Sequence, residues 1–214
     1  MICLTENDIL LKLASFDLLS ETLALLKIEP SDVYVLPSAK YKIKKDKKLL
    51  AKYGEGVGRA LSFLESTTEI NFKPDDKELL LLNNVRHETT GELLIHDGEQ
   101  LLLTFSHPTE QVILATGDKV CLRALAKFPE CSPFHQRFHG KVLCLEQTLL
   151  WLITHHGFDQ VKQKVLPALR CDMAVQVAFG SGLSATRQMV ERTLSEYVIE
   201  LDQETSNILL KVLL

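Results

Sequence analysis

The chain has 214 residues, of which 46% are hydrophobic and 24% are charged, and its formal net charge at pH 7 is -4. These values exclude an intrinsically disordered chain, and they exclude a global positive charge of the kind that marks many nucleic-acid-binding proteins. The length suits one substantial α/β domain, or a domain of about 150 residues with an extension.

The first residues have neither the basic start nor the long apolar run of a secretory signal. No stretch of the sequence reaches the roughly 18 uninterrupted apolar residues that a membrane span needs. We therefore expect a cytoplasmic protein without membrane contact. The cysteines are odd in number, scattered and without CxxC spacing, which predicts buried thiols rather than disulfides; they are Cys3, Cys121, Cys131, Cys144 and Cys171.

In the first half of the chain, residues 2–5 are a short apolar segment, and hydrophobic residues then recur at helical spacing from 9 to 19. This pattern predicts a strand, a turn and a helix. Residues 33–37 resemble another short segment before a helix, and six lysines among residues 40–48 indicate a solvated basic arm. Further helical patterns follow in residues 49–65, 74–82 and 98–106.

The second half alternates between strands and helices. Residues 112–116 predict a strand and residues 119–127 a helix; residues 141–145 then predict a third strand, followed by a helix over 146–156. Such alternation predicts an α/β fold of three layers, with a central parallel sheet of four or five strands and helices on both faces.

Two further expectations concern the order of the strands and the division of the chain. The segments 2–5 and 112–116 are expected to be adjacent central strands, because a crevice at the middle of the sheet requires them side by side. Residues 158–214 have helical periodicity throughout, interrupted at Gly180-Ser181-Gly182. We therefore divide the chain into a domain over residues 1–157 and a helical extension over 158–214 packed on it.

Acidic side chains stand where the two central strands are expected to end. Glu6 and Asp8 follow the first strand, Asp118 follows the strand 112–116, and Glu99 opens the helix that precedes that second strand. Ligands of open parallel sheets collect at the carboxyl ends of the strands, so these four carboxylates are expected to converge on one cleft.

Clustered carboxylates repel one another, and their pKa values rise unless a cation neutralises them. A hard divalent cation suits such an all-oxygen site, which makes Mg²⁺ or Mn²⁺ the expected cofactor. Metal ions of this kind support phosphodiester hydrolysis by activating water and stabilising the leaving oxygen.

Three short motifs resemble the acidic motifs of the PIN-domain family in order and spacing across roughly residues 1–150. They are Glu6-Asn7-Asp8-Ile9, Asp97-Gly98-Glu99-Gln100 and Ala115-Thr116-Gly117-Asp118-Lys119. The resemblance implies a metal-dependent ribonuclease that acts on single-stranded RNA. It also implies Glu6, Asp8, Glu99 and Asp118 as metal ligands, with Asp8, Glu99 and Asp118 as the catalytic set, and it leaves open a protein partner, such as an antitoxin, and a homo-oligomer.

The chain departs from the family pattern in two respects. Glu6 is longer by one methylene than the Asp that the family has there, and the family's frequent fourth acid is replaced by Val120 and Cys121. The alternative function is therefore a catalytically weakened PIN-like scaffold that binds protein or RNA. Structural roles also compete: Asp8 and Asp118 suit helix N-caps, and Glu99 suits the first turn of a helix.

Two other groups of residues have a functional and a structural interpretation. Lys44, Lys45, Lys47, Lys48 and Lys119 are expected to contact RNA phosphates in a salt-sensitive way, although a lysine run is also typical of a solvated face. The spacing of Cys131, His135, His139 and Cys144 admits a zinc site, but it lacks the short CxxC knuckle.

Overall fold

Five parallel strands form the sheet of the computed structural model, which describes residues 1–105 and 111–211. The strands lie in the order β3-β2-β1-β4-β5, and every neighbouring pair runs parallel. Their bounds are β1 Ile2–Thr5, β2 Val33–Val35, β3 Thr68–Glu69, β4 Val112–Ala115 and β5 Val142–Leu143. The protein is therefore an α/β protein with a parallel sheet, as the sequence predicts.

The two central strands are β1 and β4, which confirms the predicted adjacency. Their register runs from Ile2 opposite Val112 to Thr5 opposite Ala115, so both strands end at the same level. From β1 the chain continues to β2 on one side, and the later strands β4 and β5 lie on the other. The strand order thus reverses between β1 and β4, which is the place where open α/β sheets bind their ligands.

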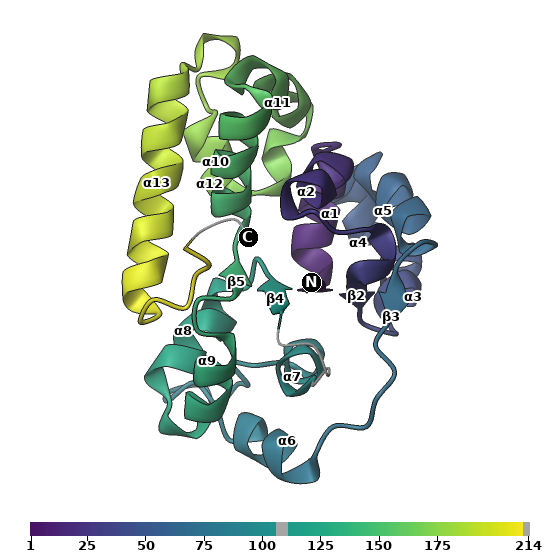
Figure 1. Cartoon of the computed structure of the whole chain (residues 1–214), viewed down its shortest axis with the longest axis vertical. Coiled ribbons are helices and arrows are strands. Elements are labelled where there is room, and N and C mark those ends of the chain that lie inside the picture. The colour runs from purple at the N-terminus through teal and green to yellow at the C-terminus, as the bar shows by residue number, and fades with distance from the viewer. Residues whose placement is uncertain (106–110, 212–214) are drawn as a thin grey trace.

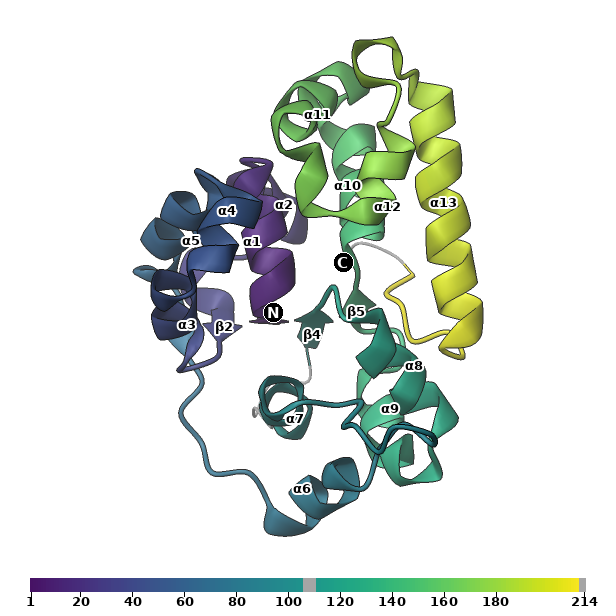
Figure 2. The ribbon, with the colours of Figure 1, turned by 180° about the vertical axis from the view of Figure 1, so that it is seen from behind.

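Helices cover both faces of the sheet (Figures 1 and 2). One face carries α1, α2 and α5, and the other carries α6, α7, α8 and α9. The helices between the strands are α1 Asn7–Ser15, α2 Leu19–Leu26, α3 Ala39–Lys45, α4 Lys47–Tyr53, α5 Gly56–Leu64, α6 Asp76–Asn83, α7 Asp97–Thr104, α8 Lys119–Lys127 and α9 Ser132–Phe138. Short 3-10 turns precede β2 and α9, as η1 Pro30–Asp32 and η2 Pro129–Cys131.

Several expected elements differ in extent from those observed. The single helix expected over residues 49–65 is two helices, because the chain turns at Gly54, whose φ is +52°. The lysines of residues 40–48 lie on α3 and α4 rather than on an irregular arm. The first helix ends at Ser15, the strand expected over 141–145 is reduced to β5, and the two-residue strand β3 is too short to show a pattern. Residue 106, the expected end of α7, lies outside the described residues.

Helix α5 approaches α1 closely at Gly56. A Cβ atom there would lie 2.6 Å from the Cα of Ser15, so only glycine permits this contact. The close approach places α4 and the start of α5 beside the first helix. Tyr53, the last residue of α4, is consequently buried next to α1.

The C-terminal part of the described chain is helical, as expected. It follows α10 Leu145–His156, and its elements are α11 Phe158–Val165, η3 Leu166–Cys171, α12 Met173–Ala178, η4 Gly182–Ser184 and α13 Arg187–Glu204. After α13 the chain returns to the sheet, where Leu210 N donates to Val142 O at 2.8 Å and Val142 N donates to Ile208 O at 3.2 Å. The buried side chains of these helices belong to the same hydrophobic cluster as the sheet.

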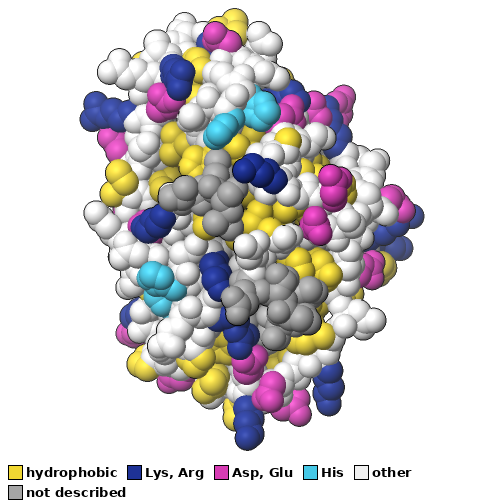
Figure 3. All heavy atoms as spheres, viewed as in Figure 1, with side chains coloured by type: hydrophobic (Ala, Val, Ile, Leu, Met, Phe, Trp, Pro, Cys, Tyr) yellow, Lys and Arg dark blue, Asp and Glu magenta, His cyan; other side chains and the backbone are white. Residues whose placement is uncertain are grey.

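The surface carries side chains of both charges, as the mixed composition leads one to expect. Over the face drawn in Figure 3, Lys and Arg side chains are interspersed with Asp and Glu. None of the helices in residues 1–105 and 111–211 is long and apolar enough to cross a membrane.

Candidate functional site

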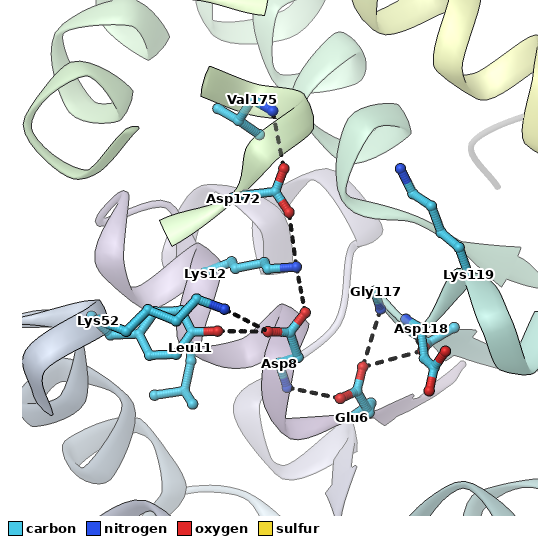
Figure 4. Close-up of polar contacts among 12 residues, drawn as sticks. Glu6, Asp8, Leu11, Lys12, Lys52, Gly117, Asp118, Lys119, Asp172 and Val175 are labelled. Atoms are coloured by element: carbon cyan, nitrogen blue, oxygen red, sulfur yellow. Dashed lines mark hydrogen bonds and ion pairs between the residues drawn. The ribbon is translucent and has the colours of Figure 1, made fainter. Parts of the chain in front are cut away.

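Glu6 connects the ends of the two central strands. It lies directly after β1 and caps α1, with Oε1 accepting a hydrogen bond from Asp8 N at 3.0 Å. Its other oxygen accepts from Gly117 N at 3.1 Å and from the Thr116 hydroxyl at 3.2 Å, beyond the end of β4 (Figure 4). Burial raises the pKa of Glu6 to about 7, and repulsion by Asp8 adds to this effect.

Asp8 lies in the first turn of α1, so its predicted role as the N-cap is wrong: Glu6 is the cap. The carboxylate of Asp8 is fully engaged by neighbouring side chains. Oδ1 accepts from the Tyr53 hydroxyl at 2.6 Å and lies 3.8 Å from the ammonium of Lys52, while Oδ2 pairs with Lys12. Asp8 is therefore neutralised by groups of the protein itself.

Lys12 is a buried cation between two carboxylates. One turn of α1 brings it to Asp8, and its ammonium lies 2.8 Å from Oδ2 of Asp172, the residue that caps α12 (Figure 4). Burial alone would lower the pKa of Lys12, but the two carboxylates outweigh it and raise the pKa. Burial likewise opposes ionisation of Asp172, whose pKa is nevertheless lowered by Lys12. The pKa shifts of Lys12 and Asp172 thus favour the charged forms of both side chains in the ion-pair cluster of Asp8, Lys12 and Asp172.

Gly117 lies against this cluster. A Cβ atom at this position would lie 2.7 Å from Oδ2 of Asp8 and 3.3 Å from the ammonium of Lys12. The turn after β4 therefore needs a glycine for the space that Asp8 and Lys12 occupy.

Asp118 and Glu99 lie at the starts of two helices on the other face of the sheet. Oδ1 of Asp118 accepts from Cys121 N at 2.9 Å, so the expected N-cap role of Asp118 is confirmed. Glu99 lies in the first turn of α7, also as expected. Burial raises the pKa of Glu99, and the charge of Asp118 raises it further. Glu99 in turn contributes to the raised pKa of Glu6, so these three carboxyl groups form one electrostatic group.

A pocket of about 260 Å³ opens beside this group. Glu6, Asn7 and Glu99 line it. The rest of its wall comprises Leu36, Lys42, His96, Asp97 and Gly98. Two buried oxygens in this lining, Oδ1 of Asn7 and Oε2 of Glu99, have no hydrogen-bond partner among the described residues. Buried polar atoms are almost always paired, so these two unpaired acceptors distinguish the pocket as a candidate site.

The residues present fit a divalent cation in part. Oxygen donors of Asn, Asp and Glu are the ligands that Mg²⁺ and Mn²⁺ prefer, and Glu6, Glu99 and Asp118 form no ion pair with a described residue. Against this, no three His, Cys, Asp or Glu side chains in the described ranges come together as a metal-binding group. The carboxylate of Asp8 pairs with Lys12, so a metal site made of all four carboxylates stays a prediction. The oxygen donors that line one pocket are those of Asn7, Glu99 and Glu6.

Glu146 is a fourth acid at the strand ends, and sequence reasoning missed it. It is buried in the first turn of α10, directly after β5, and it pairs with Lys119, whose ammonium also lies 5.2 Å from the ring centre of Tyr197. Its position after a predicted strand was the available signal. Lys119, one of the expected RNA contacts, is therefore engaged in an internal ion pair.

Lys12, Tyr53 and Asp172 were missed for a different reason. Lys12 is one helical turn from Asp8, which is a readable spacing, but Tyr53 and Asp172 reach Asp8 and Lys12 only through the tertiary fold.

The remaining expected site residues lie apart from this region. Lys44, Lys45, Lys47 and Lys48 are exposed on α3 and α4. In the candidate zinc motif, His135 Nε2 lies 2.9 Å from Thr205 O, and burial raises the thiol pKa of Cys131 to about 11 and that of Cys144 to about 12. All five cysteines are buried and free, as predicted.

Comparison of the chain with protein-family models, with curated proteins and with solved structures finds no match.

Proposed function

We propose that the protein is a PIN-like, metal-dependent ribonuclease that hydrolyses phosphodiester bonds of single-stranded RNA with Mg²⁺ or Mn²⁺. The observation that carries this proposal is the pair of unpaired buried oxygens, Asn7 Oδ1 and Glu99 Oε2, in one pocket beside Glu6. A cation there would satisfy both oxygens and offset the repulsion that contributes to the raised pKa values of Glu6 and Glu99.

Each residue has a role in this proposal. Asn7, Glu99 and Glu6 would hold the ion, and Asp118 would add negative charge from the end of β4. When bound, the ion would supply a polarised phosphate and an activated water. Lys42, exposed in the wall of the same pocket, would attract the phosphate of the substrate.

The location of the pocket also supports the proposal. Glu6, which lines the pocket, follows β1, and Asp118 follows β4; the order of the sheet reverses between these two strands, and ligands of open α/β sheets bind at such points. The order and spacing of the three acidic motifs resemble those of PIN-domain ribonucleases, and this resemblance is the reason for choosing RNA as the substrate.

The test combines cation binding with cleavage. Mn²⁺ titration by calorimetry should give saturable binding to the parent protein, and a panel of labelled single-stranded RNAs should be cut in Mn²⁺ or Mg²⁺. The variant Glu99→Gln should lose both properties, because an amide neither carries the charge nor binds the ion as well. Glu200→Gln, which removes one exposed charge on α13, is the matched control and should retain both. A parent protein that neither binds Mn²⁺ nor cuts RNA would refute the proposal.

A second candidate function is supported by the ion pairs of Lys12. A lysine that already neutralises Asp8 and Asp172 favours a PIN-like scaffold that binds RNA or protein without hydrolysis. For this candidate we expect RNA or a protein partner to bind in EDTA as well as in Mn²⁺, with no cleavage in either. Cleavage that disappears with Glu99→Gln decides against it.

A further inference from the structure

A cleft of about 780 Å³ lies between α4–α5 and the segment that joins α11 to α12. One wall is formed by residues 51–56 and Arg59, and the opposite wall by Lys164 and residues 166–170. Figure 2 shows α4 facing this C-terminal segment. The volume falls within the range of roughly 300–1,000 Å³ that is typical of ligand sites.

The cleft is positively charged on a protein whose net charge is -4. Four basic side chains line it, against two acidic ones. The basic residues are Lys52, Arg59, Lys164 and Arg170, and the acidic residues are Asp17 and Glu55. Basic residues concentrated in a cleft of an acidic protein favour an anionic ligand there.

The two acids are neutralised within the cleft, so the excess charge can be assigned. Asp17 lies 3.7 Å from Arg59 and 3.2 Å from Lys164, and Glu55 lies 3.0 Å from Arg59. Arg170 is exposed and forms no hydrogen bond or ion pair with a described residue. Lys52 is exposed too, and its ammonium lies 3.8 Å from Oδ1 of Asp8 and 4.7 Å from the ring centre of Tyr53. Lys52 and Arg170, on opposite walls, therefore carry the charge that is available to a ligand.

Both walls of the cleft border the ion-pair cluster of Asp8, Lys12 and Asp172. On one side, Lys52 and Tyr53 line the cleft and also contact Asp8. On the other side, Arg170 is followed two residues later by Asp172, which pairs with Lys12. The cleft therefore borders residues that contact Asp8 directly and, through Asp172, lie near Lys12.

From this arrangement we infer that the cleft binds the phosphate backbone of a single-stranded RNA segment and leads it toward the ion-pair cluster of Asp8, Lys12 and Asp172. The choice of RNA as the ligand rests on the proposed function. The path of the RNA along the cleft rests on the positions of Lys52 and Arg170. The cleft has the volume of a ligand site, which admits a short extended segment of single strand rather than a double helix.

The experiment measures RNA binding without cleavage. A fluorescent single-stranded oligouridine of twelve nucleotides is titrated with protein in EDTA, at several salt concentrations, by fluorescence anisotropy. The double variant Lys52→Gln/Arg170→Gln should weaken binding at low salt by about tenfold, and the slope of log K against log salt should fall by roughly 0.7 for each phosphate that the protein no longer neutralises. Arg59 and Lys164 are left unchanged because both donate to main-chain carbonyls.

The matched control is Lys73→Gln/Lys77→Gln. It removes the same charge from exposed positions at and just before α6, on the opposite face of the sheet. We expect its affinity to stay within about twofold of the parent and its salt slope to be unchanged. Equal losses in the two double variants, or a parent protein that does not bind the oligonucleotide at low salt, would overturn the inference.

The outcome for the cleft can be separated from the outcome for hydrolysis. If the parent binds RNA through Lys52 and Arg170 in EDTA but cuts nothing in Mn²⁺, the cleft stands and the ribonuclease proposal fails. If the parent cuts RNA in Mn²⁺ while the cleft variant binds as tightly as the parent, the ribonuclease proposal stands and the cleft inference fails.

Discussion

The ammonium group of Lys12 lies 2.8 Å from Oδ2 of Asp172, and this ion pair joins the first helix of the chain to the C-terminal helices. Because Lys12 also pairs with Asp8, five acids of this region fall into two groups. Asp8 and Asp172 share an internal cation, whereas Glu6, Glu99 and Asp118 form no ion pair with a described residue. The two groups should therefore respond differently to substitution, to pH and to metal.

Removal of the internal cation should destabilise the fold. In Lys12→Met, the carboxylates of Asp8 and Asp172 lose their common partner, and loss of one member of a buried pair leaves an uncompensated charge. We expect the free energy of unfolding to fall by about 3 kcal/mol, measured by urea denaturation at pH 7 in EDTA. Arg192→Met removes a cation from an exposed pair on α13 and should cost less than about 1 kcal/mol. If Lys12→Met lowered the free energy of unfolding by no more than Arg192→Met does, the charges of Asp8 and Asp172 would be solvated.

Ionisation of Glu6 should make the protein less stable as the pH rises. The pKa of Glu6 is raised from 4.5 to about 7 in the fold, so the folded state binds more protons than the unfolded state between these values. The contribution of Glu6 to the free energy of unfolding is therefore fully present below pH 4.5 and is lost as the pH rises through 7. The total change in the free energy of unfolding is about 3 kcal/mol.

The measurement for Glu6 is urea denaturation at pH 5.5 and pH 8 in EDTA. Glu6→Gln, which has no titratable group at this position, should lack this component of the pH dependence. Parallel pH profiles for the parent and Glu6→Gln would show that Glu6 does not titrate in this range.

A methyl group at position 117 should disturb the ion-pair cluster. In Gly117→Ala the new Cβ would lie 2.7 Å from Oδ2 of Asp8, so either Asp8 or the turn must move. We expect a loss of about 1–3 kcal/mol in the free energy of unfolding, the usual cost of overpacking. The control is Gly58→Ala in α5, where a Cβ meets nothing within 4 Å and the helix propensity of alanine should stabilise by up to about 1 kcal/mol. Equal effects of the two substitutions would contradict the close approach at Gly117.

Asp118→Asn should separate the helix-capping role of Asp118 from its charge. Asparagine caps helices as well as aspartate does, so the bond to Cys121 N can persist, while repulsion with Glu99 is relieved. Without metal, the thermal midpoint should therefore equal or exceed that of the parent. The rise of the midpoint with Mn²⁺ should shrink, because the site loses one negative charge. If the thermal midpoint of the variant rose with Mn²⁺ as much as that of the parent, Asp118 would serve only as a helix cap.

The exposed lysines of α3 and α4 should contribute to RNA affinity through charge alone. Neutralising Lys44, Lys45, Lys47 and Lys48 to glutamine should weaken binding of single-stranded RNA in EDTA and flatten its salt dependence, by roughly 0.7 in slope for each RNA phosphate that these lysines neutralise in the parent. Anisotropy titrations at several salt concentrations provide both quantities. An unchanged slope would show that these lysines only solvate the helix surface.

Most of the fold could be predicted from the sequence because its signals are local. The apolar segments at 2–5 and 112–116 and the helical spacing that follows each one predicted the strands, the helices and the parallel sheet, with β1 beside β4. The elements that were wrong or absent are those with weak local signals. The helix break at Gly54 falls within an otherwise helical pattern, and β3 has only two residues.

The sequence by itself determined where the acids of the site stand, because strand ends and helix starts depend on hydrophobic spacing and on capping within a few residues. Asp118 and Glu99 are accordingly found at the starts of α8 and α7. Only the tertiary structure decided which charges are neutralised. Asp172 reaches Lys12, and Tyr53 reaches Asp8, because the packing of α4 and α12 around α1 brings together residues that are distant along the chain. Burial, which no local pattern measures, raises the pKa values of Glu6 and Glu99.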